Sequence, residues 1–162
     1  MNPFGLFKSL FQKYKEYANI KRYRQQWRAK NSHNYTTIGD YVPDAVEVGN
    51  ETYGTISVSS FGNKQEHLKI GNYCSIANDV LFLLGGNHTM STFSQFPFDA
   101  YYNTGVRHVT PTKGPITVED DVWIGHGSTI LSGVTIGQGA IIGAKSVVSK
   151  NVPPYAVYVG NR

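Results

Sequence analysis

The chain has 162 residues, of which 40% are hydrophobic and only 16% are charged, with 17 glycines. This composition excludes a disordered chain and indicates one turn-rich β domain with its own core. The formal net charge of +4 is divided unevenly, because residues 1–30 carry eight Lys or Arg and one Glu, while the remainder carries seven basic and ten acidic residues. The basic character therefore belongs to the N-terminal segment.

Cysteine content and hydropathy indicate a cytoplasmic protein. Cys74 is the single cysteine, so an internal disulfide is impossible. No run approaches the roughly 18 apolar residues that would cross a bilayer. Residues 1–11 lack the small-residue cleavage site of a secretory leader. We expect Cys74 to be a small, buried hydrophobic residue.

Residues 1–35 are predicted to form a basic amphipathic helix and a linker. Asn2 and Pro3 suit the first positions of a helix. Aromatic residues then recur at helical spacing between basic ones: Phe4, Phe7, Phe11, Tyr14 and Tyr17. The favoured interpretation is a helix that caps the open end of the first coil. The alternative is peripheral contact with an anionic membrane through residues 1–30. No nucleic-acid partner is expected, because a basic helix without a known motif is weak support for one.

From residue 36 onward the sequence advances in steps of six residues. The step is irregular at first, with inward positions at Ile38, Val48, Ile70, Ile76 and Phe82. Between residues 118 and 152 it is regular, with Val118, Ile124, Ile130, Ile136, Ile142 and Val148 as the aliphatic positions. Four residues after each stands a small or branched residue: Val122, Ser128, Val134, Ala140, Ser146 and Val152.

A strict six-residue repeat fits neither the helical period nor the strand period, and it is the signature of a parallel β-helix. Each hexad forms a short strand and a turn, and three hexads close one triangular coil. The glycines directly after the aliphatic residues, such as Gly125 and Gly137, are expected to let the backbone turn tightly.

The repeat is interrupted after Phe82, so a long loop at about residues 83–115 is expected to leave the coil. The next six-residue step falls on His88. Five aromatic residues follow: Phe93, Phe96, Phe98, Tyr101 and Tyr102. A long insertion in a solenoid is usually functional, and these aromatic residues suggest the wall of a binding cleft.

The hexads occur together with four further motifs: Gly86-Asn87-His88, Phe96-Pro97-Phe98, Asp121-Val122-Trp123-Ile124-Gly125 and the tail that begins Val152-Pro153-Pro154-Tyr155. This combination resembles the hexapeptide-repeat acyltransferases, in particular the xenobiotic (chloramphenicol-type) acetyltransferases and the acetyltransferases of surface-polysaccharide gene clusters. The resemblance covers residues 36–162. It implies an all-β, left-handed parallel β-helix domain over that range, a homotrimer, acetyl-CoA as the donor and no required metal.

The resemblance also assigns roles to individual residues. His88 corresponds to the family's general base, and a neutral imidazole is suited to accept the proton of an attacking hydroxyl. CoA contacts are expected along the C-terminal coils, at His126, Ala144, Ser149 and Lys150. Lys150 offers a positive charge to the CoA phosphates. Family members usually continue past Gly160-Asn161 with Pro-Ala-Lys and a basic helix, so the contact to the adenosine phosphate would have to come from Arg162 or from another chain. The acceptor-binding residues remain unassigned.

The favoured function is O-acetylation of a sugar hydroxyl in surface-polysaccharide biosynthesis, with the protein in the cytoplasm or at the inner face of the membrane. Drug acetylation and amino-sugar N-acetylation remain open, because loop shape selects the acceptor. A γ-carbonic-anhydrase-like enzyme needs two His five residues apart, whereas His67, His88, His108 and His126 are separated by 21, 20 and 18. A non-catalytic scaffold is the third class.

Overall fold

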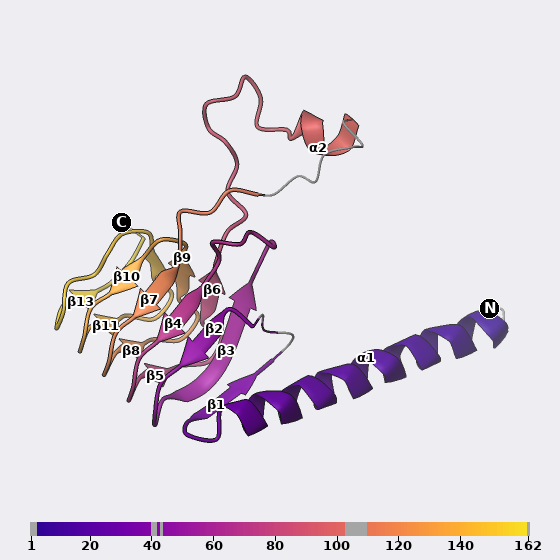
Figure 1. Cartoon of the computed structure of the whole chain (residues 1–162), viewed down its shortest axis with the longest axis horizontal. Helices are drawn as coiled ribbons and strands as arrows, with labels where there is room; N and C mark the ends of the chain where they lie inside the picture. The colour runs from indigo at the N-terminus through magenta and orange to yellow at the C-terminus, as the bar shows by residue number, and fades with distance from the viewer. Residues whose placement is uncertain (1–2, 40–41, 43, 103–109, 162) are drawn as a thin grey trace.

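The computed structural model describes residues 3–39, 42, 44–102 and 110–161, and it shows a long helix leading into a prism of short parallel strands (Figure 1). Helix α1 spans Pro3–Lys30, and the short helix α2 spans Phe98–Tyr102. The strands are β1 (Tyr35–Ile38), β2 (Val46–Val48), β3 (Tyr53–Ser59), β4 (Leu68–Ile70), β5 (Ser75–Ile76), β6 (Leu81–Leu83), β7 (Ile116–Val118), β8 (Trp123–Ile124), β9 (Thr129–Leu131), β10 (Thr135–Ile136), β11 (Ile141–Ile142), β12 (Val147–Val148) and β13 (Val157–Tyr158).

Parallel pairing places these strands on three faces. The first face runs β2-β4-β7-β10, the second β5-β8-β11-β13 and the third β6-β9-β12. β3 pairs through its first half with β1 and through its second half with β6, so it turns from the second face to the third. Ile124 pairs with Ile142 and Ile130 with Val148, so one coil takes 18 residues, or three hexads. The predicted left-handed parallel β-helix is therefore confirmed.

The core is the row of hexad positions that the sequence predicts. All twelve aliphatic and small positions between residues 118 and 152 are buried. The earlier inward residues Ile38, Val48, Ile70, Ile76 and Phe82 are buried as well. Cys74 is fully buried, its Sγ lies 3.1 Å from the Glu119 carbonyl oxygen, and burial raises the pKa of its thiol. The interpretation of Cys74 as a small buried residue is confirmed.

The expected role of the glycines after the aliphatic residues is wrong. Gly125 does not have a positive φ; the left-handed backbone comes two residues later, at Gly127 (φ 66°). The equivalent positions of neighbouring turns are occupied by Asp121 (φ 59°) and Lys145 (φ 58°). A Cβ on Gly125 would lie 2.6 Å from the backbone nitrogen of Ala144 in the next coil. Glycine is needed there because consecutive coils approach closely, and not because the chain turns.

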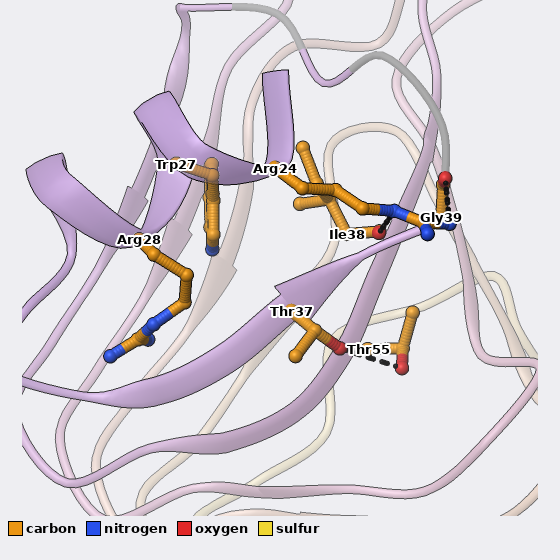
Figure 2. A pocket seen from close by; sticks show the side chains of 7 residues that line it. All are labelled: Arg24, Trp27, Arg28, Thr37, Ile38, Gly39 and Thr55. Carbon is orange, nitrogen blue, oxygen red and sulfur yellow. Dashed lines mark hydrogen bonds between the residues drawn. The ribbon is translucent and has the colours of Figure 1, made fainter. Parts of the chain in front are cut away.

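The last turns of α1 attach the helix to the first coil (Figure 2). Trp27 is 8% exposed, and its Nε1 donates to Oγ1 of Thr36 at 3.1 Å. Arg24 donates to the carbonyls of Ile38 and Gly39, and Arg28 donates to those of Asn34 and Thr36. Among the described strands β1 pairs with β3 alone, so these side chains satisfy carbonyls of an edge strand.

The rest of α1 projects away from the prism (Figure 1). Its apolar residues Leu10, Phe11, Tyr14 and Tyr17 are each more than half exposed. The capping function expected of the whole helix is thus confined to its C-terminal end, at residues 24–28. Neither described helix is long and apolar enough to cross a membrane. The predicted Asn2 cap lies outside the described residues, as do the side chains of Phe4 and Phe7.

Candidate active site

The long loop leaves the prism after β6 and returns at β7 (Figure 1). Hydrogen bonds clamp its two ends together: Thr112 Oγ1 donates to the Leu84 carbonyl, and the Asn87 backbone N–H donates to the Pro111 carbonyl at 3.1 Å. The Asn87 side chain also donates to Oγ of Ser132 on the next coil at 3.3 Å. The residue directly before His88 is therefore fixed to the coil.

His88 itself is exposed, and one of its ring nitrogens is occupied. Its Nδ1 lies 2.6 Å from the backbone carbonyl oxygen of Gln95. A carbonyl can only accept a hydrogen bond, so in a neutral imidazole Nδ1 carries the proton and Nε2 keeps its lone pair. This arrangement gives His88 the tautomer and the ring orientation that a general base needs.

A pocket of about 310 Å³ lies beside His88, lined by residues 87–89 and 92–98 together with Thr110 and Pro111. Phe93, Phe96 and Phe98 form part of its wall, and the rings of Phe96 and Phe98 meet edge to face at 4.8 Å. These rings pack on one another and remain open to solvent, with Phe93 96% exposed. Three of the five aromatic residues expected to form a wall thus line the pocket beside His88, whereas Tyr101 and Tyr102 do not line it.

The four predicted CoA contacts are exposed and fall at two corners of the prism. His126 and Ala144 occupy equivalent positions of consecutive coils, because Ile124 pairs with Ile142. Ser149 and Lys150 follow β12, at the corner from which the loop also leaves the coil. The two pairs therefore flank the third face, and the second pair shares its corner with the loop that carries His88. Arg162 lies outside the described residues.

His126 and His67 each lie near one carboxylate. Nε2 of His126 is 3.7 Å from Oδ2 of Asp79, and Nε2 of His67 is 3.6 Å from Oε1 of Glu47. Among the described residues, no group of three or more His, Cys, Asp or Glu is arranged to hold a metal ion. His108, one of the histidines in the carbonic-anhydrase spacing test, lies outside them.

Glu66 supports this site, although no sequence pattern indicated it. The residue is 5% exposed, and its carboxylate accepts hydrogen bonds from the Ser60 hydroxyl at 2.6 Å and the Phe61 N–H at 2.9 Å. A Cβ on Gly85 would lie 2.5 Å from its Oε1, so the carboxylate sits directly beneath the start of the loop. Most of its donors are backbone N–H groups, which every non-proline residue offers, so the sequence carries no signal of this contact.

We expect Glu66→Ala to lower the free energy of unfolding by about 1–3 kcal/mol, because it removes the charged acceptor of part-buried hydrogen bonds from Ser60, Phe61 and Gly62. Urea denaturation measures the change. Gln65→Ala is the matched control: its side chain is exposed at the adjacent position, and it should change stability by less than about 0.5 kcal/mol. Equal losses in the two variants would contradict the structural role of Glu66.

Comparison with known proteins agrees with this fold. The family described as bacterial transferase hexapeptide (six repeats) matches residues 115–150. The chain is 45% identical over 103 residues to a probable macrolide acetyltransferase of Lysinibacillus sphaericus, covering 59% of this chain and 57% of that protein. It is 36% identical over 103 residues to a chloramphenicol acetyltransferase of Agrobacterium fabrum, covering 59% of this chain and 49% of the relative.

Solved structures extend the similarity to most of the coil. A maltose O-acetyltransferase from Clostridium difficile matches with a TM-score of 0.58 and 29% identity, over 79% of this chain and 62% of that one. A hexapeptide-repeat acetyltransferase from Vibrio cholerae matches with a TM-score of 0.58 and 25% identity, over 78% and 62%. The chain spans about half the length of the sequence relatives it matches. The chain is therefore similar in its repeat and in its coil to hexapeptide-repeat transferases, and the relatives and solved structures that it matches are named as acetyltransferases.

Proposed function

We propose that this protein is an acetyl-CoA-dependent O-acetyltransferase in which His88 is the general base. The observation that carries the proposal is the hydrogen bond between His88 Nδ1 and the Gln95 carbonyl, which leaves Nε2 free beside a pocket. The acceptor hydroxyl attacks the thioester carbonyl carbon of acetyl-CoA while Nε2 accepts its proton. The C–S bond then breaks, and the imidazolium returns the proton to the departing CoA thiolate. No protein nucleophile is required.

The acceptor we favour is a sugar hydroxyl, in the assembly of a surface polysaccharide. The aromatic faces of Phe93, Phe96 and Phe98 offer apolar contact to a ring, and Thr92, Ser94 and Gln95 add polar groups to the same pocket. The similarity to a maltose O-acetyltransferase supports this choice. The named sequence relatives support a second candidate, the acetylation of a macrolide or of chloramphenicol. Because acetyl-CoA is the donor, we place the reaction in the cytoplasm.

One assay tests the proposal and separates the candidates. The protein is incubated with radiolabelled acetyl-CoA and, in parallel, with maltose, nucleotide sugars, lipid-linked glycans, chloramphenicol and a macrolide. Label transferred to a carbohydrate supports the favoured acceptor, and label on either drug supports the second. A protein that neither binds acetyl-CoA nor transfers label to any acceptor would be a scaffold instead.

The CoA site is proposed to lie along the third face, between its two flanking corners. Lys150 would interact with the phosphates, and Ser149, His126 and Ala144 would contact the rest of the cofactor. Support comes from the exposure of all four residues and from the shared corner of Lys150 and the loop. A neighbouring subunit would then form the other wall of this CoA-binding groove. Binding of the donor would therefore depend on the oligomeric state.

The second face of the prism supports a homotrimer. Its outward positions line up through the strand register as Tyr35, Tyr53, Ser75, Trp123, Ile141 and Val157. The four of these that are exposed are apolar or aromatic: Tyr35, Tyr53, Trp123 and Val157. The equivalent outward row of the first face is polar, with Glu47, Lys69, Thr117 and Thr135. An exposed apolar row along the length of a soluble prism is typical of a protein interface. We propose that the second face packs against other copies of the chain.

Trp123→Asp is expected to convert the trimer to a monomer, because it introduces a carboxylate into the centre of that row. Sedimentation equilibrium at micromolar concentration measures the mass. Thr117→Asp, on the polar first face, should leave the mass of the assembly unchanged. A wild-type protein that sediments as a stable monomer would contradict the trimer.

A further inference from the structure

The two interpretations of the N-terminal helix belong to different parts of it. Arg24, Trp27 and Arg28 donate hydrogen bonds to the first coil, so the C-terminal end of α1 caps that coil. The N-terminal half extends beyond the prism, where nothing in the described chain covers it (Figure 1). Four of its apolar residues are 52–68% exposed: Leu10, Phe11, Tyr14 and Tyr17. This half of the helix is therefore available to a partner.

The projecting half has the distribution of side chains found on helices that lie in a membrane interface. With about 100° between successive residues, the four apolar residues occupy an arc of about 120°. Lys13 and Lys15 lie on either side of this arc, at about 90° and 110° from its centre, and Glu16 lies about 150° away. Lys15 covers the Phe11 ring, with its Nζ 4.7 Å from the ring centroid.

The net positive charge of residues 1–30 favours binding to an anionic surface. Residues 1–30 carry eight basic residues against the single acid Glu16, which lies opposite the arc. The arc could enter the boundary between headgroups and acyl chains while the flanking lysines reach the lipid phosphates. Tyr14 and Tyr17 combine an apolar ring with a polar hydroxyl, a combination enriched at membrane interfaces.

A second copy of the helix fits this surface less well. A coiled-coil seam through Tyr14 and Tyr17 continues with the next positions of the heptad spacing, which are Lys21, Arg24 and Arg28. Paired copies would bring these like charges together along half of the seam. Arg24 and Arg28 are moreover bonded to carbonyls of the same chain. The seam is thus suited to a flat anionic surface and not to a bundle of identical helices.

We propose that the N-terminal half of α1 docks the enzyme on an anionic lipid bilayer, with Leu10, Phe11, Tyr14 and Tyr17 as the inserted face. The C-terminal end of the same helix keeps the prism attached. This surface is separate from the pocket beside His88, so it stands whether or not the protein transfers acetyl groups. Membrane attachment would bring the coil to acceptors carried on lipids.

The test is co-sedimentation of the full-length chain with vesicles of phosphatidylcholine and phosphatidylserine. We expect binding that weakens as the salt concentration rises from about 0.1 M to about 0.5 M, and little binding to pure phosphatidylcholine. The triple variant Leu10→Gln, Phe11→Gln, Tyr14→Gln should lose it. The double variant Lys13→Gln, Lys15→Gln should bind about 25-fold more weakly, because each basic residue near an anionic surface contributes a factor of about five.

Tyr23→Gln is the matched control, since it removes one aromatic residue from another side of the same helix and should leave vesicle binding unchanged. Thermal melting of the triple and double variants should match the wild type, because residues 10–15 lie in the part of α1 that projects beyond the coil. Absence of binding at low salt would overturn the proposal, as would equal binding by the triple variant. Two other results would replace the lipid with another partner: salt-sensitive binding to RNA without vesicle binding, or a change of sedimenting mass in the triple variant.

Discussion

Replacing His88 with alanine is expected to lower kcat for acetyl transfer by about 10²–10⁴-fold, the usual loss when a general base is removed. The reason is that, among the described residues that line the pocket, His88 alone carries a basic ring nitrogen that can take the proton of the acceptor hydroxyl. The His88 side chain is exposed, and its hydrogen bond to the Gln95 carbonyl lies within the loop and outside the core. Its removal should therefore leave the thermal midpoint unchanged. Release of free CoA thiol, measured continuously, follows the reaction.

His67→Ala is the matched control, because His67 lies on the first face of the prism and contacts Glu47. It should transfer acetyl groups at the wild-type rate. The binding of CoA should also be unchanged in His88→Ala, which separates loss of chemistry from loss of the donor. Turnover within a few-fold of wild type in that variant would remove His88 from the mechanism.

Ile142→Asp is expected to prevent folding of the C-terminal coils. Ile142 is fully buried and stacks between Ile124 and Tyr158 of adjacent coils. A carboxylate at this position would be desolvated without a partner, which costs several kcal/mol, comparable to the total stability of a typical domain. Circular dichroism and urea denaturation detect the loss. Ile136→Asp should behave in the same way, since it occupies the equivalent position one hexad earlier.

Gln138→Asp supplies the control for both substitutions. Gln138 is exposed at the turn, two residues after Ile136, and its side chain lies outside the prism. The substitution should change stability by about 0.5 kcal/mol or less, as for most surface positions. Equal damage at Gln138 and Ile136 would mean that the hexad register is wrong by two residues.

The hexads predicted the coil well because solenoid contacts are periodic. In a β-helix each inward residue meets the residue one coil away, so a repeat in the sequence specifies a repeat in space. Ile124, Ile130 and Ile136 were placed inside for this reason, and they are buried. Cys74 followed from the same register. The hand of the coil did not follow from the period, because general crossover rules favour the opposite hand, and the family resemblance supplied it.

Contacts that do not follow the six-residue period cannot be predicted from it. The support that Glu66 gives to the loop depends on backbone N–H groups, which leave no trace in a sequence pattern. The close approach of Gly125 to Ala144 depends on how consecutive coils stack. Gly125 is therefore required for close packing and not, as expected, for the turn.

By itself, the sequence determined the repeat, the buried positions, the break in the coil after Phe82 and the basic character of residues 1–30. The tertiary structure decided which nitrogen of His88 is occupied, which apolar row of the prism is exposed, and which end of α1 holds the coil. These features depend on pairs such as His88 with Gln95 or Trp27 with Thr36, which no period relates. The geometry of these pairs depends on the directions in which the loop and the helix leave the prism. The six-residue repeat within the prism does not determine those directions.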